Sequence, residues 1–129
     1  MPPSVRALLD GSLSSYRHEL LIDNIKDISI LQQHGSIDHN VPAFHSRLMN
    51  QLIKMHGANV SYFELPGKNH WFDGIMTTKP LSQFFERELN NFAHSFRAPE
   101  AFTLTVANPA DSGPKFGVDI LYLRRPGQP

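Results

Sequence analysis

Apolar residues recur at helical spacing near the beginning of the chain. Between Ser4 and Asn24 they stand three or four positions apart, which is the period of one face of an α-helix. Gly11 interrupts the series, so the pattern predicts two short helices that cover one side of a sheet. The series comprises Val5, Leu8, Leu9, Leu13, Tyr16, Leu20 and Leu21.

A strand and a helix are predicted next. The β-branched and apolar run at residues 28–33 predicts a short strand that ends where the chain can turn, at His34 and Gly35. Pro42 suits the first turn of a helix because it has no amide hydrogen to lose there. The apolar stripe after it stops at Gly57 and predicts a crossover helix of about four turns. That stripe comprises Phe44, Leu48, Leu52 and Met55.

The pattern then returns to a strand. Residues 60–65 predict a second strand, which ends at Pro66 and Gly67. A strand, a helix and a strand in this order predict a right-handed parallel unit. A helix is predicted from about Lys79 to Pro99, and its apolar stripe is typical of core packing. The members of that stripe are Leu81, Phe84, Phe85, Leu89, Phe92 and Phe96.

The last part of the chain has a different pattern. Residues 102–106 and 118–122 are short runs rich in apolar and β-branched residues, and a loop rich in Asn, Pro, Asp and Gly separates them. They predict two further strands that pair as a hairpin after the α/β part.

Composition narrows the class of protein. With 129 residues, of which 40% are hydrophobic and 19% charged, the chain has the composition of one soluble globular domain. Its 12 basic and 12 acidic residues are scattered, which argues against binding to nucleic acid or to an anionic membrane. No segment reaches the roughly 20 apolar residues of a membrane span. The absence of cysteine excludes disulfides and thiolate metal sites and leaves the compartment open.

Two motifs carry candidate chemistry. Asp38 lies in the sequence HGSIDHNVP, after the first predicted strand, and His70 lies in PGKNHWF, after the second. Both turns are expected at the same carboxyl edge of neighbouring parallel strands, where ligands bind. α/β-Hydrolases supply the acid and the base of their triad in this order after the serine. No G-x-S-x-G pentapeptide, which would hold that serine, occurs in the chain.

Other interpretations of these residues remain open. Asp38 is also suited to capping the helix that begins near Pro42, in which case His70 merely packs in a loop. Trp71 and Phe72 form either a substrate wall or, as their apolar bulk favours, packing that holds His70. A zinc site formed by His34, Asp38, His39 and His45 is disfavoured because these positions diverge along the turn and the helix.

The two motifs resemble segments of a known enzyme family. Residues 31–42, LQQHGSIDHNVP, resemble the H-G-x-x-D-x-x-V segment around the acid of prolyl-oligopeptidase-family serine peptidases. Residues 64–74, ELPGKNHWFDG, look like the loop that carries the catalytic histidine of that family. The resemblance covers residues 28–96. The tail looks like the C-terminal extension of some large members, and His39 departs from the second acidic residue that the family often has.

The resemblance implies a fold, a domain division and an activity. Residues 1–98 would be the C-terminal half of an α/β-hydrolase sheet, with parallel strands and crossover helices, and residues 99–129 a β-hairpin extension. Asp38 and His70 would be the acid and base of a Ser-Asp-His triad that hydrolyses peptide bonds without metal or cofactor. The family's serine and oxyanion amides have no counterpart here, so the isolated chain is expected to be inactive.

The expected partners follow from the same resemblance. They are a peptide substrate in the full-length enzyme and an upstream or complementing hydrolase half. Two alternatives remain. One is a fragment of an esterase or dienelactone-type hydrolase, and the other is a non-catalytic remnant that binds another chain through an exposed strand edge.

Overall fold

A computed structural model describes residues 1–95 and 98–124 of the chain. The chain divides into two compact units. One comprises Lys26–Pro99 and is called here the βαβ unit, and the other combines Met1–Ile25 with Glu100–Pro129 and is called the terminal unit. The division into residues 1–98 and 99–129 stays a prediction.

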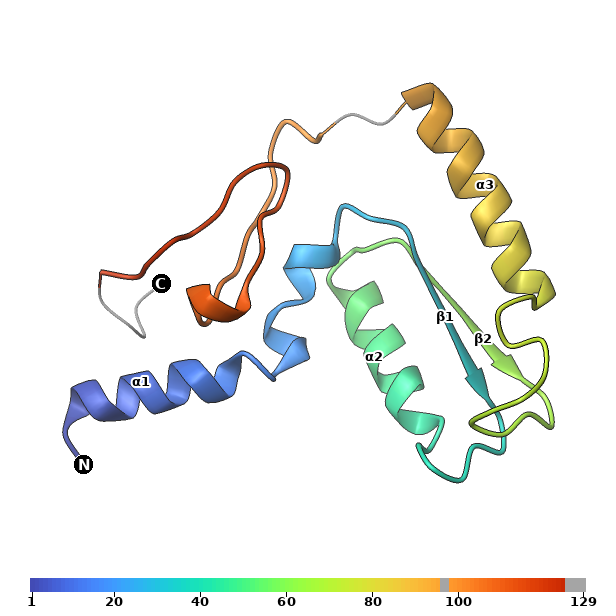
Figure 1. Cartoon of the computed structure of the whole chain (residues 1–129), viewed down its shortest axis with the longest axis horizontal. Coiled ribbons are helices and arrows are strands. Elements are labelled where there is room, and N and C mark those ends of the chain that lie inside the picture. Colours follow the sequence, from blue (N-terminus) through green and yellow to red (C-terminus); the bar gives the residue numbers. More distant parts are fainter. Residues whose placement is uncertain (96–97, 125–129) are drawn as a thin grey trace. The chain divides into compact units, whose positions relative to one another are not determined.

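The βαβ unit contains the predicted parallel pair of strands (Figure 1). β1 (Ile30–Gly35) and β2 (Val60–Leu65) are joined by the crossover helix α2 (Phe44–Met55). The strands pair in parallel, with Ile30 opposite Val60 and Gly35 opposite Leu65. The α/β class is therefore confirmed. β1 begins two residues later than predicted and includes Gly35, because its pairing with β2 continues to the end of that strand.

α2 packs against both strands through a face that the apolar stripe did not predict. Ala43, just before the helix, is buried together with Asn50 and Ile53, and these residues recur at helical spacing. Of the predicted stripe, Phe44, Leu48 and Met55 are exposed, whereas Leu52 is half-buried. The buried face of α2 is therefore shifted from the predicted one.

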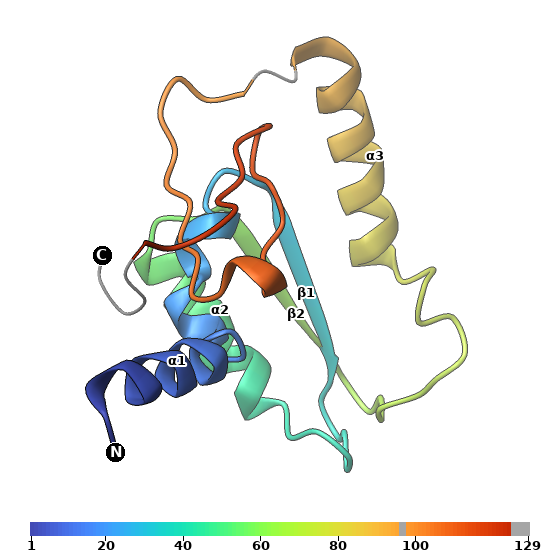
Figure 2. The same ribbon diagram turned by 60° about the vertical axis from the view of Figure 1, so that its left-hand side comes forward.

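α3 (Lys79–Ser95) forms where a helix was predicted. Its predicted core stripe is covered only in part: Leu81 and Phe84 are half-buried. Phe85, Leu89 and Phe92 are 49%, 67% and 67% exposed. They line an open groove of about 590 Å³ together with the residues just before β1, Asp27 to Ser29. Figure 2 and Figure 1 both show α3 on the side of the strands away from α2. The predicted Phe96 lies outside the described residues.

The terminal unit begins with one helix where two were predicted. α1 (Pro3–Ser14) continues through Gly11, because a single glycine costs a helix only about 1 kcal/mol relative to alanine. Short 3₁₀ helices follow at His18–Leu20 and Ile22–Ile25.

The predicted hairpin is wrong. Residues 102–106 and 118–122 form no strands. The backbone of Thr105 pairs instead with the side chain of Asn24, which donates from Nδ2 to the carbonyl at 2.7 Å and accepts from the amide at 2.6 Å. The chain reverses more tightly than predicted, through an antiparallel bridge between Lys115 and Val118. A short 3₁₀ helix, Pro109–Asp111, occupies the intervening loop.

Candidate active site

The turn after β1 orders Asp38. Its Oδ1 accepts the backbone amides of Asn40 and Val41, each at 2.9 Å. These amides precede α2, whose N-cap residue is Ala43 and has no side-chain cap. Asp38 therefore stabilises its own turn and does not cap the crossover helix, so that alternative reading of Asp38 is wrong.

The loop after β2 lies directly against this turn. The amide of Ile37 donates to the Lys68 carbonyl at 3.0 Å, and the Oδ1 of Asn69 accepts the amides of His39 at 3.0 Å and His70 at 2.8 Å. Gly35 makes this approach possible. A Cβ at Gly35 would lie 2.6 Å from the Asn69 carbonyl oxygen and closer still to that of Lys68.

These contacts bring the two predicted site residues together. His70 Nδ1 lies 2.9 Å from Asp38 Oδ2. The Asp38 side chain is 4% exposed and the His70 side chain 33% exposed. With Nδ1 occupied by the carboxylate, the imidazole keeps Nε2 for another partner, and no hydrogen bond to Nε2 is present within residues 1–95 and 98–124. The pair has the geometry of an acid that orients a base.

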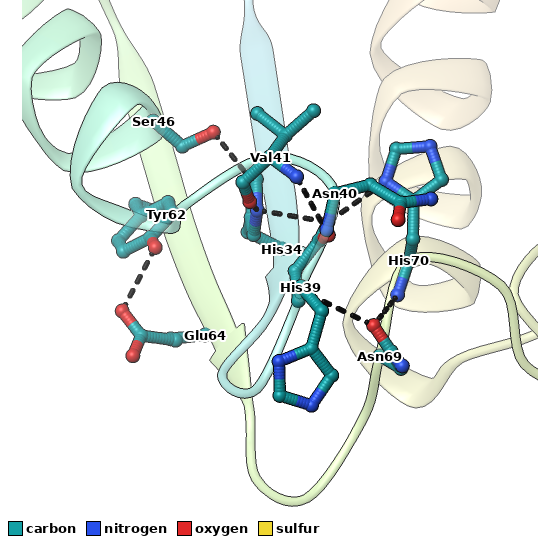
Figure 3. A network of polar contacts seen from close by, with 10 residues as sticks. His34, His39, Asn40, Val41, Ser46, Tyr62, Glu64, Asn69 and His70 are labelled. Carbon is teal, nitrogen blue, oxygen red and sulfur yellow. Dashed lines mark hydrogen bonds and ion pairs between the residues drawn. The ribbon is translucent and has the colours of Figure 1, made fainter.

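Sequence reasoning missed a second imidazole at the same carboxylate (Figure 3). His34 Nε2 lies 3.2 Å from Asp38 Oδ2 and 2.9 Å from the Val41 carbonyl oxygen. Its other nitrogen, Nδ1, lies 2.8 Å from Ser46 Oγ. The available signal was the position of His34 at the strand end, four residues before the acid.

The surroundings of Asp38 keep it ionised. Burial by itself would raise its pKa, but the amides of Val41 and Asn40 and the hydrogen bond from His70 outweigh burial and lower the pKa to about 2. Asp38 is therefore a negatively charged acceptor at neutral pH.

The loop beyond His70 is tied back to β1. Gln33 donates from Nε2 to the Ile75 carbonyl at 2.8 Å and accepts from the Thr78 hydroxyl at 2.6 Å. A small cavity of about 150 Å³ lies beside the pair. It is lined by Gln33, His34, Gly35, Asp38, Leu65, His70, Phe72 and Ile75.

The two aromatic residues after His70 differ in burial. Phe72 is half-buried at the cavity, whereas Trp71 is 77% exposed. The indole of Trp71 meets the His70 imidazole edge to face, with ring centroids 5.2 Å apart. The packing role expected for Trp71 is thus limited to this ring contact.

The histidines considered for zinc do not converge. His39 is exposed, and the ring of His45 lies against that of Phe44 at 4.0 Å between centroids. Among the described residues, no group of three or more His, Asp or Glu side chains is placed to hold a metal ion. The described helices likewise include none that is long and apolar enough to cross a membrane.

Comparisons with known proteins identify a longer relative. A protein of Arthroderma benhamiae that is described as an uncharacterized secreted protein is 38% identical to this chain over 105 residues. The match covers 81% of this chain and 11% of that protein, so the chain spans about a ninth of its relative's length. No family model matches the chain. No solved structure matches it.

Proposed function

We propose that Asp38 and His70 are the acid and base of a serine peptidase that resembles the prolyl oligopeptidase family. The chain would form the C-terminal part of an α/β-hydrolase catalytic domain, in which another segment supplies the nucleophilic serine. One observation carries this proposal: the buried carboxylate of Asp38 holds His70 Nδ1 at 2.9 Å and leaves Nε2 for a substrate-side partner.

The arrangement suits acyl transfer. Nε2 of His70 would take the proton of the serine hydroxyl while Oγ attacks the peptide carbonyl carbon, and the imidazolium would then give that proton to the leaving amine. Asp38 would hold the Nδ1–H tautomer and stabilise the imidazolium. Water, activated by the same imidazole, would release the acyl group as a carboxylic acid and regenerate the serine.

The length of the relative is compatible with the missing parts. The chain corresponds to 11% of the Arthroderma benhamiae protein, and a complete α/β domain commonly takes about 250 residues. A longer polypeptide has room for a G-x-S-x-G turn, for the oxyanion amides and for a domain that restricts substrate size. By the same similarity, we propose that the enzyme is secreted.

The exposed face of α3 favours a second candidate function. Phe85 and Leu89 leave a large apolar area uncovered on a helix of the βαβ unit, and such areas mark interaction sites. In this alternative the chain is a non-catalytic remnant that binds another chain. An esterase or dienelactone-type hydrolase would use the same acid and base, and only substrate tests separate it from a peptidase.

The test uses the longest reading frame that encodes this chain. The expressed polypeptide should react with a fluorophosphonate probe. It should also hydrolyse peptide amides at a higher rate than the one expected from its rate on the matched esters. His70→Ala and Asp38→Asn should each lower hydrolysis by about 10⁴-fold, the loss typical of a damaged triad. His39→Ala is the matched control because His39 is a neighbouring but exposed histidine, and it should leave the rate within twofold.

Three outcomes would contradict the peptidase proposal. Probe labelling that survives His70→Ala would show that another base serves the serine. Hydrolysis of esters alone would identify the esterase alternative. Failure of the long polypeptide to label at all, with the fold intact, would favour the binding role.

A further inference from the structure

We infer that His34 is a positioning residue that, together with Ser46, fixes the carboxylate of Asp38 for His70. Its catalytic meaning rests on the proposed function, but its geometry does not. His34 is the last residue but one of β1, Asp38 lies in the turn, and Ser46 lies in the first turn of α2. The three side chains therefore join a strand, a loop and the crossover helix at one point.

The contacts of His34 identify where its protons are. Nε2 lies 2.9 Å from the carbonyl oxygen of Val41, which can only accept a hydrogen bond. Nε2 must therefore carry the hydrogen, and the same N–H faces Asp38 Oδ2 at 3.2 Å. In the neutral imidazole Nδ1 is then the acceptor, so the Ser46 hydroxyl donates to it at 2.8 Å.

His34 restrains the turn that holds the Asp38 carboxylate. Its N–H binds the carbonyl of Val41, whose own amide donates to Asp38 Oδ1. Its Nε2 also lies 3.2 Å from Oδ2, the oxygen that accepts the hydrogen bond of His70 Nδ1. Rotation of the carboxylate away from His70 would break the contact with His34 as well.

The burial of His34 makes this restraint effective. Its side chain is 11% exposed, so water competes little for the N–H that binds the Val41 carbonyl. His70, by contrast, is one-third exposed and lies in the loop between β2 and α3. A buried partner restrains the carboxylate on the side away from solvent, and this matters because a small misplacement of catalytic groups is costly.

The test measures the hydrogen bond itself. In the 129-residue chain labelled with ¹⁵N-histidine, the hydrogen on His70 Nδ1 should give a far-downfield proton resonance, and its rate of exchange with water reports how well Asp38 holds it. His34→Leu removes, at similar volume, the N–H that binds the Val41 carbonyl, and it should speed exchange about tenfold, the loss of roughly one hydrogen bond. His34→Gln keeps an N–H donor of similar reach and should leave the exchange rate at the wild-type value.

Two further variants keep the inference falsifiable. Ser46→Ala leaves His34 in place but removes the group that orients it, and exchange should rise about threefold. His45→Leu is the matched control, since His45 is exposed and stacks on Phe44, and it should change nothing. If His34→Leu fails to fold, as judged by circular dichroism, the comparison of His34→Gln with Ser46→Ala carries the test.

The outcomes separate this inference from the proposed function. A folded His34→Leu variant that exchanges at the wild-type rate would overturn the inference, and so would equal acceleration in His34→Gln and His34→Leu. Because the NMR measurement needs no nucleophile, it stands even if the longer polypeptide never labels with the fluorophosphonate. In an active enzyme, His34→Leu should lower kcat and leave KM within twofold, and His34→Gln should restore most of kcat.

Discussion

Two regions of the βαβ unit differ in how far contacts within the unit bind or cover their side chains. At the carboxyl edge of the strands, two backbone amides and the His70 imidazole donate hydrogen bonds to Asp38, and His34 lies in contact with it. On α3, the large apolar residues Phe85 and Leu89 remain exposed. Contacts within the unit therefore bind the polar side chains of the turn, whereas they leave the apolar side chains of α3 uncovered. Under the proposed function, the missing part of the hydrolase would cover this face of α3.

The largest effect should come from the one well-buried branched residue of α2. Ile53 is 3% exposed, and replacing it with alanine should lower the free energy of unfolding by about 3 kcal/mol, because a cavity is left where the helix meets the strands. Leu89→Ala on α3 should change it by about 0.5 kcal/mol or less, since Leu89 is already largely in water. Urea unfolding followed by circular dichroism measures both.

This pair of variants tests the comparison directly. Equal losses would show that the α3 face is covered in solution, by self-association or by other residues of the same chain. Dilution separates these two causes, because only self-association makes the loss at Leu89 depend on protein concentration.

The next effect concerns the close approach of the two site loops. Gly35→Ala places a methyl group against the carbonyls of Lys68 and Asn69, and backbone atoms cannot move aside as a flexible side chain can. The turn and the loop should separate, at a cost of about 2 kcal/mol. The His70 Nδ1 proton should then exchange faster, because Asp38 and His70 are carried apart.

Gly113→Ala provides the control for Gly35→Ala. Nothing lies within 4 Å of a Cβ at Gly113, so stability should stay within about 0.5 kcal/mol. An unchanged exchange rate in Gly35→Ala would mean that the loops do not need this contact to hold the acid and base together.

The helices and strands that the sequence predicted correctly depend on residues that are close together in the chain. Residues 60–65 form a strand, and a helix follows Pro42, because strand runs, proline and glycine act within a few residues. The parallel pairing of the strands then brings Asp38 and His70 to one edge, as expected of a strand, crossover helix and strand. Their 2.9 Å contact could therefore be anticipated in outline.

The parts that sequence missed depend on contacts between distant residues. The segment 102–106 has strand-like composition, but the side chain of Asn24, 81 positions from Thr105, takes its backbone groups. The contact of His34 with Ser46 depends on the packing of α2 against β1, and the burial of α2 was read from the wrong stripe. Periodicity shows which faces are apolar, but it does not show which face another element covers.

A smaller effect is expected in the terminal unit, where the Asn24 amide replaces a strand partner. Asn24→Ala removes two partly buried hydrogen bonds to Thr105 and should cost about 1 to 2 kcal/mol. Hydrogen exchange at the Thr105 amide should rise most, because that amide loses its acceptor. Asn90→Ala, at an exposed position of α3, is the control and should stay within about 0.5 kcal/mol. Protection of Thr105 that survives Asn24→Ala would indicate that the predicted strand pairing exists after all.

The smallest effect on stability at neutral pH is expected at Glu64, a second carboxylate that hydrogen bonds hold. Glu64 on β2 accepts two hydrogen bonds from Arg47, at 2.6 and 2.7 Å, and one from Tyr62 at 2.9 Å. Arg47 foremost, and Tyr62 after it, lower the pKa of Glu64 to about 2, against the opposing effect of burial. The side chain of Arg47 is more than half exposed, so solvent and salt screen this pair far more than they screen Asp38.

The pH dependence of stability should distinguish the two carboxylates. Both have a pKa near 2 in the folded chain and about 4 when unfolded, so their contribution is complete above about pH 4.5 and is lost as the pH falls towards 2. Glu64→Gln should lower the urea midpoint at pH 7 by the small amount that Glu64 contributes there and should leave the midpoint near pH 2 unchanged, so midpoints fall less steeply over this range. Salt at about 0.5 M should weaken the Glu64 share and leave the Asp38 share. An acid slope that Glu64→Gln leaves unaltered would mean that solvent and salt screen the Arg47–Glu64 pair completely and that it contributes nothing to stability.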